Sequence, residues 1–227
     1  MGLVHTMALF ARGGAEGIQA NQRDWSPFLV HFTSAAAMKT LRNPLGHSAA
    51  VIERRLRCAD SHSFRIVEKI ASSEQLKANT PTGKKCEPCI CFSECTLPGL
   101  IALSERYGRF GFAFRKAKLF DKGARPCVYV DTKSYASIGN HSQSLGASVE
   151  ARWLAGLSNV YRPVKHDDRP IQDFTHEREW RLFRDLNLTQ LSPEFVICPS
   201  TQFRKMRRRF PSIGQVLPID TLFEWGA

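Results

Sequence analysis

Apolar residues recur along the chain with two different spacings, which predict a mixture of short strands and helices. Apolar and small side chains alternate in residues 110–114, as in a strand, whereas Leu100, Ile101 and Leu103 follow a helical spacing that ends at Gly108. Strands are expected at 28–34, 89–93, 110–114, 128–130, 179–183, 195–198 and 216–219, and helices at 35–41, 49–58, 64–76, 97–107, 135–157 and 201–210. Short strands of unequal spacing mixed with helices predict an α+β fold with a mixed central sheet and flanking helices.

The length and composition of the chain are those of one domain. With 227 residues, of which 43% are hydrophobic, the chain is long enough to bury one substantial core. Residues 1–24 contain scattered polar positions without periodicity, which predicts an N-terminal extension. We therefore expect a single domain over residues 25–227.

The charge balance favours an anionic partner. The formal net charge is +11, and basic residues cluster at 54–57 and again near the C-terminus. The second cluster predicts a basic helix that binds nucleic-acid phosphates, and a solvated helical face is the alternative for both clusters. The candidate nucleic-acid-binding residues are Arg204, Lys205, Arg207, Arg208 and Arg209.

Seven cysteines and the absence of a signal or membrane-spanning pattern predict a cytoplasmic protein with reduced thiols and no membrane partner. Four of these cysteines fall within ten residues: Cys86, Cys89, Cys91 and Cys95. The Cys86–Cys89 spacing suits a zinc knuckle, but no intervening loop brings a second pair of ligands around. A buried strand carrying small apolar thiols is favoured, with zinc as the alternative and no metal expected.

Two carboxylates stand two residues apart in the run Thr175-His176-Glu177-Arg178-Glu179-Trp180-Arg181. In an extended strand Glu177 and Glu179 share one face. Such a pair suits catalysis, in which one glutamate holds a sugar hydroxyl and the other polarises a nucleophile. The structural alternative is a salt bridge between Glu179 and Arg181 or Arg115.

A histidine interrupts the first apolar strand. Alternation places His31 and Thr33 on one strand face together with Leu29. A ligand-binding role and a core histidine bonded to a backbone carbonyl are both compatible with this pattern. We expect His31, Ser93 and Glu179, each on a predicted strand, to converge on one cleft.

Four short motifs in this order resemble the AbiGi-type abortive-infection family of phage-defence proteins. They are His31-Phe32-Thr33, Cys91-Phe92-Ser93-Glu94 followed by Leu97-Pro98, Tyr107-Gly108-Arg109-Phe110-Gly111, and Glu177-x-Glu179-Trp180-Arg181. The resemblance spans about residues 28–200. It implies a role in phage defence or a toxin-antitoxin system, with a cognate toxin or antitoxin as partner.

The order of these residues is also similar, more distantly, to ADP-ribosyltransferases, including DarT-like enzymes that modify DNA. That resemblance implies an ADP-ribosyltransferase-like fold and NAD as substrate. It gives His31 and Thr33 a role in binding NAD, places Ser93 and Tyr107 beside the nicotinamide, and makes Glu179 the catalytic carboxylate with Glu177 as its partner. The second motif reads Cys-Phe-Ser-Glu where these enzymes have Ser-Thr-Ser, and Tyr129 is an alternative to Tyr107 as the stacking tyrosine.

Three functional classes follow from these patterns. The first is an ADP-ribosyltransferase that acts on nucleic acid or protein, stabilising an oxocarbenium-like transition state through Glu179. The second is a non-catalytic antitoxin or regulatory binding module. The third is a nucleic-acid-binding protein in which the glutamates are structural.

Overall fold

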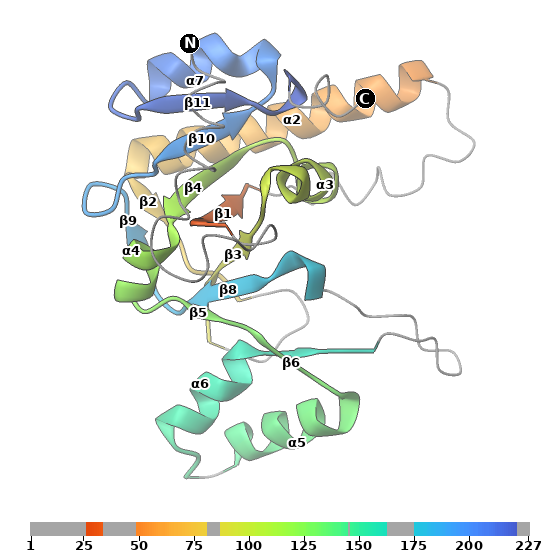
Figure 1. Cartoon of the computed structure of the whole chain (residues 1–227), viewed down its shortest axis with the longest axis vertical. Helices are drawn as coiled ribbons and strands as arrows, with labels where there is room; N and C mark the ends of the chain where they lie inside the picture. The colour runs from red at the N-terminus through yellow and green to blue at the C-terminus, as the bar shows by residue number, and fades with distance from the viewer. Residues whose placement is uncertain (1–25, 34–48, 81–86, 145, 163–174, 222–227) are drawn as a thin grey trace.

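A seven-stranded sheet forms the centre of the computed structural model, which describes residues 26–33, 49–80, 87–144, 146–162 and 175–221 (Figure 1). The strand order is β11-β10-β4-β1-β3-β8-β5, and of its neighbouring pairs β10–β11 alone is parallel. The strands are β1 (Phe28–Phe32), β3 (Ile90–Glu94), β4 (Gly111–Arg115), β5 (Arg125–Pro126), β8 (Glu179–Leu182), β10 (Phe195–Cys198) and β11 (Gln215–Pro218). The predicted α+β fold with a mixed sheet is confirmed.

Six α-helices accompany the sheet in the described residues. They are α2 (Ala49–Ser73), α3 (Leu97–Tyr107), α4 (Lys116–Asp121), α5 (Thr132–Gln143), α6 (Val149–Leu157) and α7 (Phe203–Arg209). The sequence predicts two helices where α2 runs without a break. The polar residues between them blur the apolar periodicity, but none is a glycine or proline, so the backbone continues as a helix.

The sheet has an apolar cluster on each face. On one face, Val67 and Ile70 of α2 and Met206 of α7 pack against strand residues such as Phe92. The other face is covered by α3 in the same way, through Leu100 and Leu103. Helices therefore flank both faces, and the site residues on neighbouring strands are divided between these two sides.

A small lobe lies beyond the β8–β5 end of the sheet (Figure 1). It contains α5 and α6 with the parallel pair β6 (Val128–Val130) and β7 (Ser158–Val160). The predicted helix at 135–157 is divided between α5 and α6, because Gly146 adopts a φ of 86° and the Ser148 side chain caps a new helix by accepting from the Ala151 backbone N–H. A second two-stranded sheet pairs β2 (Gln75–Leu76) with β9 (Leu186–Asn187).

The segment before β8 differs from the predicted strand. A 3-10 turn spans Thr175–Glu177, and Arg178 has a φ of 42°, so β8 begins only at Glu179. The expectation that Glu177 and Glu179 share one extended strand is therefore wrong. A left-handed residue lies between the two glutamates, and the two carboxylates have different partners.

Some predicted features fall outside the described residues. These are the extension at 1–24 and the helix at 35–41, together with the side chains of the basic cluster at 54–57, whose backbone belongs to α2.

Candidate functional site

Ser93 and Glu179 lie side by side on the face of the sheet that α3 covers. Ser93 is the register partner of Val30 on one side and of Glu179 on the other. Register partners in an antiparallel ladder project to the same face, and Val30 belongs to the cluster beneath α3. The structure therefore brings together two of the three residues expected to form one cleft.

The Glu179 carboxylate is held by the guanidinium of Arg181. Nε of Arg181 donates to Oε1 of Glu179 at 2.8 Å, and Nη2 donates to Oε2 at 2.9 Å. Arg181 is 1% exposed, and its Nη1 also donates to the carbonyls of Gly156 and Ser158. Burial lowers the pKa of Arg181, but the bond to Glu179 outweighs that effect and raises the pKa overall. The pair is charged, and it joins β8 to α6 and β7.

Two side chains from the small lobe reach the same strand. Asn159 donates from Nδ2 to Oε2 of Glu179 at 3.1 Å, and the backbone N–H of Glu179 donates to the Tyr129 hydroxyl at 3.4 Å. Burial raises the pKa of Tyr129 above its ordinary value. Polar groups from three strands therefore contact Glu179: Asn159 of β7 and Arg181 of β8 bond its carboxylate, and Tyr129 of β6 bonds its backbone.

Glu177 is held by the end of α3. The Tyr107 hydroxyl donates to Oε1 of Glu177 at 2.5 Å, and Nη1 of Arg106 lies 2.9 Å from the same oxygen. Burial and this hydrogen bond raise the pKa of Tyr107, to which Glu179 adds a smaller effect of the same sign. Glu177 is buried, and its charge is compensated locally by Arg106. Tyr107 also packs against the apolar cluster beneath α3, on the Glu179 side of the sheet, and its role in binding NAD stays a prediction.

His31 lies on the opposite face. It pairs in register with Phe112, and its ring makes an edge contact with Phe92, both of which belong to the cluster beneath α2. Thr33 follows β1 and donates its hydroxyl to the Phe110 carbonyl at 3.4 Å. The expectation of one cleft holding His31, Ser93 and Glu179 is therefore wrong for His31, because β1 presents odd-numbered and even-numbered residues to different faces.

The imidazole of His31 is anchored through one nitrogen. Nδ1 lies 2.9 Å from the Cys91 carbonyl, and burial lowers the pKa of the ring. A carbonyl only accepts, so Nδ1 carries the proton of the neutral ring and Nε2 is an acceptor. The alternative given by the sequence, a core histidine bonded to a backbone carbonyl, therefore matches the contact that Nδ1 makes.

The cysteines form no recognisable metal centre in the part of the chain that is described. The sulfurs of Cys89 and Cys91 lie 3.9 Å apart, and Cys91 and Cys95 form no disulfide. No group of three or more His, Cys, Asp or Glu side chains among the described residues is arranged to hold a metal ion. Cys86 lies outside the described residues.

The predicted basic helix is present as α7. Its buried positions include Met206, while Arg204, Lys205, Arg207, Arg208 and Arg209 are all exposed. This helix packs on the His31 face of the sheet, remote from the Ser93–Glu179 pair. The expectation that it borders the same cleft as Glu179 is therefore wrong, and its binding to phosphates stays a prediction.

The sequence did not indicate the contribution of the small lobe to this site. Asn159 has no motif around it, and Arg181 was visible in the sequence only as a partner that neutralises Glu179. Pairing across the lobe and the sheet depends on tertiary contacts that no local spacing encodes.

None of the helices in the described ranges has the length and apolar character needed to span a lipid bilayer.

Comparison with known families gives a match over part of the chain. A family model described as "Putative abortive phage resistance protein AbiGi, antitoxin" matches residues 61–152, which is less than half of the chain. The matched stretch contains Ser93 and Tyr107 but neither His31 nor Glu179. Comparison with curated proteins and with solved structures returned no match. The similarity to the abortive-infection family is thus supported over this stretch, and no comparison supports the resemblance to ADP-ribosyltransferases.

Proposed function

We propose that the chain acts as the antitoxin of an abortive-infection system and neutralises a cognate toxin protein by binding it. The match of residues 61–152 to the AbiGi antitoxin family is the observation that carries this proposal. The geometry supports it, because Glu179 is tied to a buried arginine and Glu177 to Tyr107 and Arg106. Carboxylates with these partners stabilise the fold, and a binding protein requires no catalytic role from them.

The small lobe offers a surface for such a partner. Helix α6 is fixed to the sheet through its buried end at Gly156 and Leu157, while three of its apolar side chains are exposed beside the charged Glu150 and Arg152. Val149 is 68% exposed, Trp153 41% and Leu154 44%. Val149 and Trp153 are four residues apart and share one helix face. Exposed apolar side chains that gather on one element mark protein-interaction sites, and tryptophan is enriched among the residues that dominate binding energy.

Coexpression tests the proposal. The chain would be expressed with the protein encoded by the neighbouring gene, the expected position of a cognate toxin, and growth and co-purification would be measured. We expect rescue of growth and a stable complex, both abolished in Trp153→Asp. Phe120→Asp is the matched control, because Phe120 is 46% exposed on α4, outside this surface. A folded wild-type chain that neither binds nor neutralises that protein would refute the proposal.

A second candidate is NAD-dependent ADP-ribosyl transfer. The side-by-side arrangement of Ser93 and Glu179, with Tyr107 and Glu177 close by, favours it. Here Glu179 stabilises the oxocarbenium-like transition state through a ribose hydroxyl, and nucleic acid or protein is the acceptor.

Labelled NAD separates the two candidates. The chain would be incubated with NAD and a pool of DNA, RNA and protein, and nicotinamide release and label transfer would be followed. If the chain is a transferase, Glu179→Gln should lower the rate of NAD turnover per folded molecule by about 10²-fold or more. Glu177→Gln should lower this rate less. Wild-type protein that releases no nicotinamide and labels no acceptor excludes this candidate and leaves the antitoxin proposal standing.

A further inference from the structure

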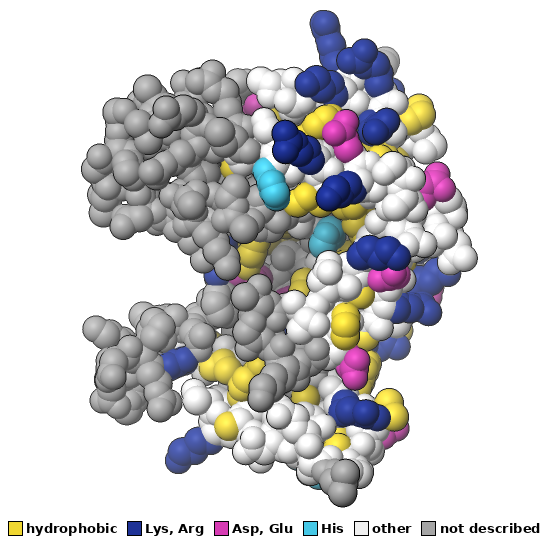
Figure 2. Space-filling model, turned by 180° about the vertical axis from the view of Figure 1, so that it is seen from behind, with side chains coloured by type: hydrophobic (Ala, Val, Ile, Leu, Met, Phe, Trp, Pro, Cys, Tyr) yellow, Lys and Arg dark blue, Asp and Glu magenta, His cyan; other side chains and the backbone are white. Residues whose placement is uncertain are grey.

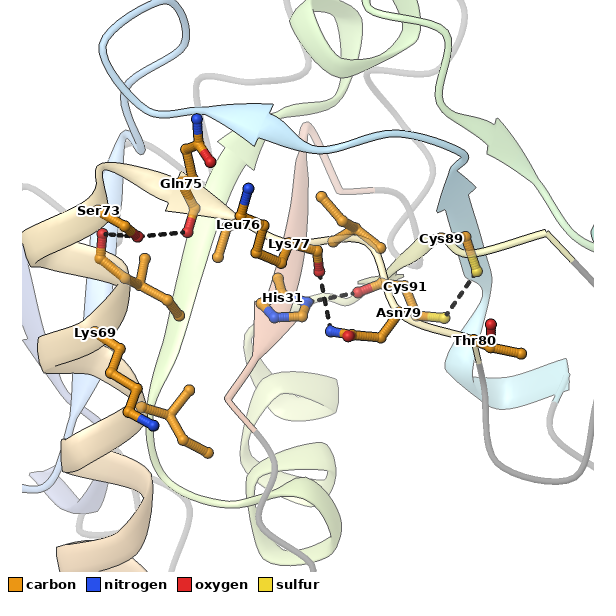
Figure 3. A pocket seen from close by; sticks show the side chains of 13 residues that line it. His31, Lys69, Ser73, Gln75, Leu76, Lys77, Asn79, Thr80, Cys89 and Cys91 are labelled. Carbon is orange, nitrogen blue, oxygen red and sulfur yellow. Dashed lines mark hydrogen bonds between the residues drawn. The ribbon is translucent and has the colours of Figure 1, made fainter.

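A cavity of about 420 Å³ opens beside His31, between the C-terminal half of α2 and strands β2 and β3. Apolar walls come from Ile66, Ile70, Leu76 and Ile90. Figure 3 shows His31 in the middle of the lining residues, with Lys69 reaching from α2 and Asn79 on the other side. The volume lies within the range of about 300–1,000 Å³ that small organic ligands occupy.

The chemistry of the cavity is that of a site for a flat group bearing an N–H donor. Nδ1 of His31 is committed to the Cys91 carbonyl, which leaves Nε2 as an acceptor without a hydrogen-bond partner among the described residues. Asn79 donates from its side-chain nitrogen to the Lys77 carbonyl, so its oxygen is a second acceptor at the rim. Two acceptors between apolar walls suit the edge and faces of a nucleobase.

A basic surface adjoins this cavity. Helix α7 packs beside α2, with the Lys205 ammonium 5.6 Å from the Phe64 ring centre and Arg209 4.0 Å from Glu68. Figure 2 shows Lys and Arg side chains gathered over this end of the molecule. Among the side chains of the two helices that the structure describes, the exposed cationic ones are Arg65, Lys69, Arg204, Lys205, Arg207, Arg208 and Arg209.

Helical spacing connects that surface to the cavity. On α2, Phe64 and Glu68 face α7, whereas Ile66, Ile70 and Ser73 line the cavity. Residues four apart share a helix face, so Arg65 and Lys69 form a row between these two sides. Lys69 belongs to both features, because it is exposed and also lines the cavity. The positive surface therefore continues to the mouth of the cavity.

We propose that this face binds single-stranded nucleic acid, with phosphates along α7 and α2 and one unpaired base in the cavity beside His31. The cationic row supplies sequence-independent attraction for the backbone. A base in a duplex has its hydrogen-bonding edge paired and its faces stacked, so the cavity selects a single strand. This activity is independent of toxin binding, which we assign to α6 at the other end of the molecule.

Fluorescence anisotropy with the purified full chain tests the proposal. The probes are a fluorescein-labelled 12-nucleotide DNA, an RNA of the same sequence and the corresponding DNA duplex, each titrated at 50, 100 and 200 mM NaCl. We expect both single strands to bind more tightly than the duplex, and the better of the two identifies the natural ligand. Equal or tighter binding of the duplex would overturn the proposal.

Two sets of variants separate the phosphate-binding surface from the base site. Arg207→Ala/Arg208→Ala should weaken binding and lower the salt slope by about 0.7 for each phosphate that the variant no longer neutralises, whereas Arg152→Ala on α6 should change neither. His31→Phe should weaken single-strand binding about 5- to 10-fold, as expected for the removal of one hydrogen bond, and leave the salt slope unchanged.

Ser73→Trp provides a second way to close the cavity if His31→Phe does not fold. Ser73 is exposed at the end of α2, where a large side chain fills the cavity mouth without entering the core. It should remove the preference for single strands. Variants at both positions that fold and keep the full preference would show that the basic surface attracts nucleic acid without a base site, and the proposal would fall.

Discussion

Arg181 and Glu179 lie two residues apart on β8 and face each other through two hydrogen bonds of 2.8 and 2.9 Å. The arginine is 1% exposed, and the glutamate side chain 13%. The same guanidinium donates to the carbonyls of Gly156 and Ser158, so one buried cation fastens the small lobe to the central sheet. Stability of the lobe and the chemistry of the Glu179 site therefore depend on the same pair.

Glu179→Gln should destabilise the fold, because it leaves the buried Arg181 charge without its counter-ion. Removing one partner of a buried ion pair costs about 3–5 kcal/mol. Glutamine keeps one acceptor oxygen for the guanidinium, so the expected destabilisation is near the lower value. Urea unfolding followed by circular dichroism measures it. Glu105→Gln, at an exposed position of α3, is the control and should unfold like the wild type. Equal stability of the two variants would show that Arg181 is compensated by other groups.

Tyr107→Phe should cost about 1–2 kcal/mol of unfolding free energy. The change removes the 2.5 Å hydrogen bond to Glu177 and leaves a buried carboxylate oxygen with Arg106 as its remaining partner. Tyr161→Phe is the matched control, since Tyr161 is 38% exposed and the removal of its hydroxyl should leave stability unchanged. Identical urea midpoints for the two variants would contradict the structural role given to Tyr107.

The strands and the fold class were readable from the sequence because their signals are local. The alternation at 110–114 predicts a strand, and β4 spans Gly111–Arg115, a shift of one residue. The helical spacing at 97–107 has the same first and last residues as α3. The boundary between α5 and α6 depends on Gly146 and Ser148, two single positions within a long mixture of polar and apolar residues. In α2 the stretch 59–63 interrupts the apolar spacing without carrying a glycine or proline, so the spacing predicts two helices where the backbone forms one.

The site was less predictable, because it depends on which face each strand presents. His31, Ser93 and Glu179 are each in or beside the strands predicted for them, yet register places His31 against Phe112 and Ser93 against Val30. A shift of one residue exchanges the two faces. The spacing within one strand shows which of its residues share a face of the sheet. It does not show which residues of another strand lie on that same face.

Stability should fall in alkaline solution through two buried thiols. Burial raises the pKa of Cys95 and of Cys198 from 9.0 to about 12. Each thiol thus keeps its proton in the folded state while the unfolded chain loses it above about pH 9. The stabilisation is full below pH 9 and declines as the pH rises toward 12, by up to about 1.4 kcal/mol per pH unit for each thiol.

Urea unfolding at pH 7, 8, 9 and 10 measures this dependence. Cys198→Val keeps an apolar side chain in the core and removes one titrating group, so its stability should decline less steeply above pH 9 than that of the wild type. The raised pKa values of Tyr107 and Tyr129 act in the same direction at higher pH and remain in both proteins. Parallel curves for variant and wild type would contradict the assignment to Cys198.

Gly156→Ala should weaken the attachment of the small lobe. A Cβ at this position would lie 2.7 Å from two ring carbons of Phe183, and the Gly156 carbonyl also accepts from the buried Arg181. The ring or the helix must move, at a cost of about 1–3 kcal/mol. Gly139→Ala on α5 is the matched change, because a Cβ there meets nothing within 4 Å and alanine favours the helix by up to about 1 kcal/mol. In thermal unfolding, the Tm of Gly156→Ala should therefore be below that of the wild type, and the Tm of Gly139→Ala should be equal to it or higher. If Gly156→Ala is as stable as Gly139→Ala, α6 does not pack closely against Phe183, and the bond from Arg181 to the Gly156 carbonyl contributes little to the attachment of the lobe.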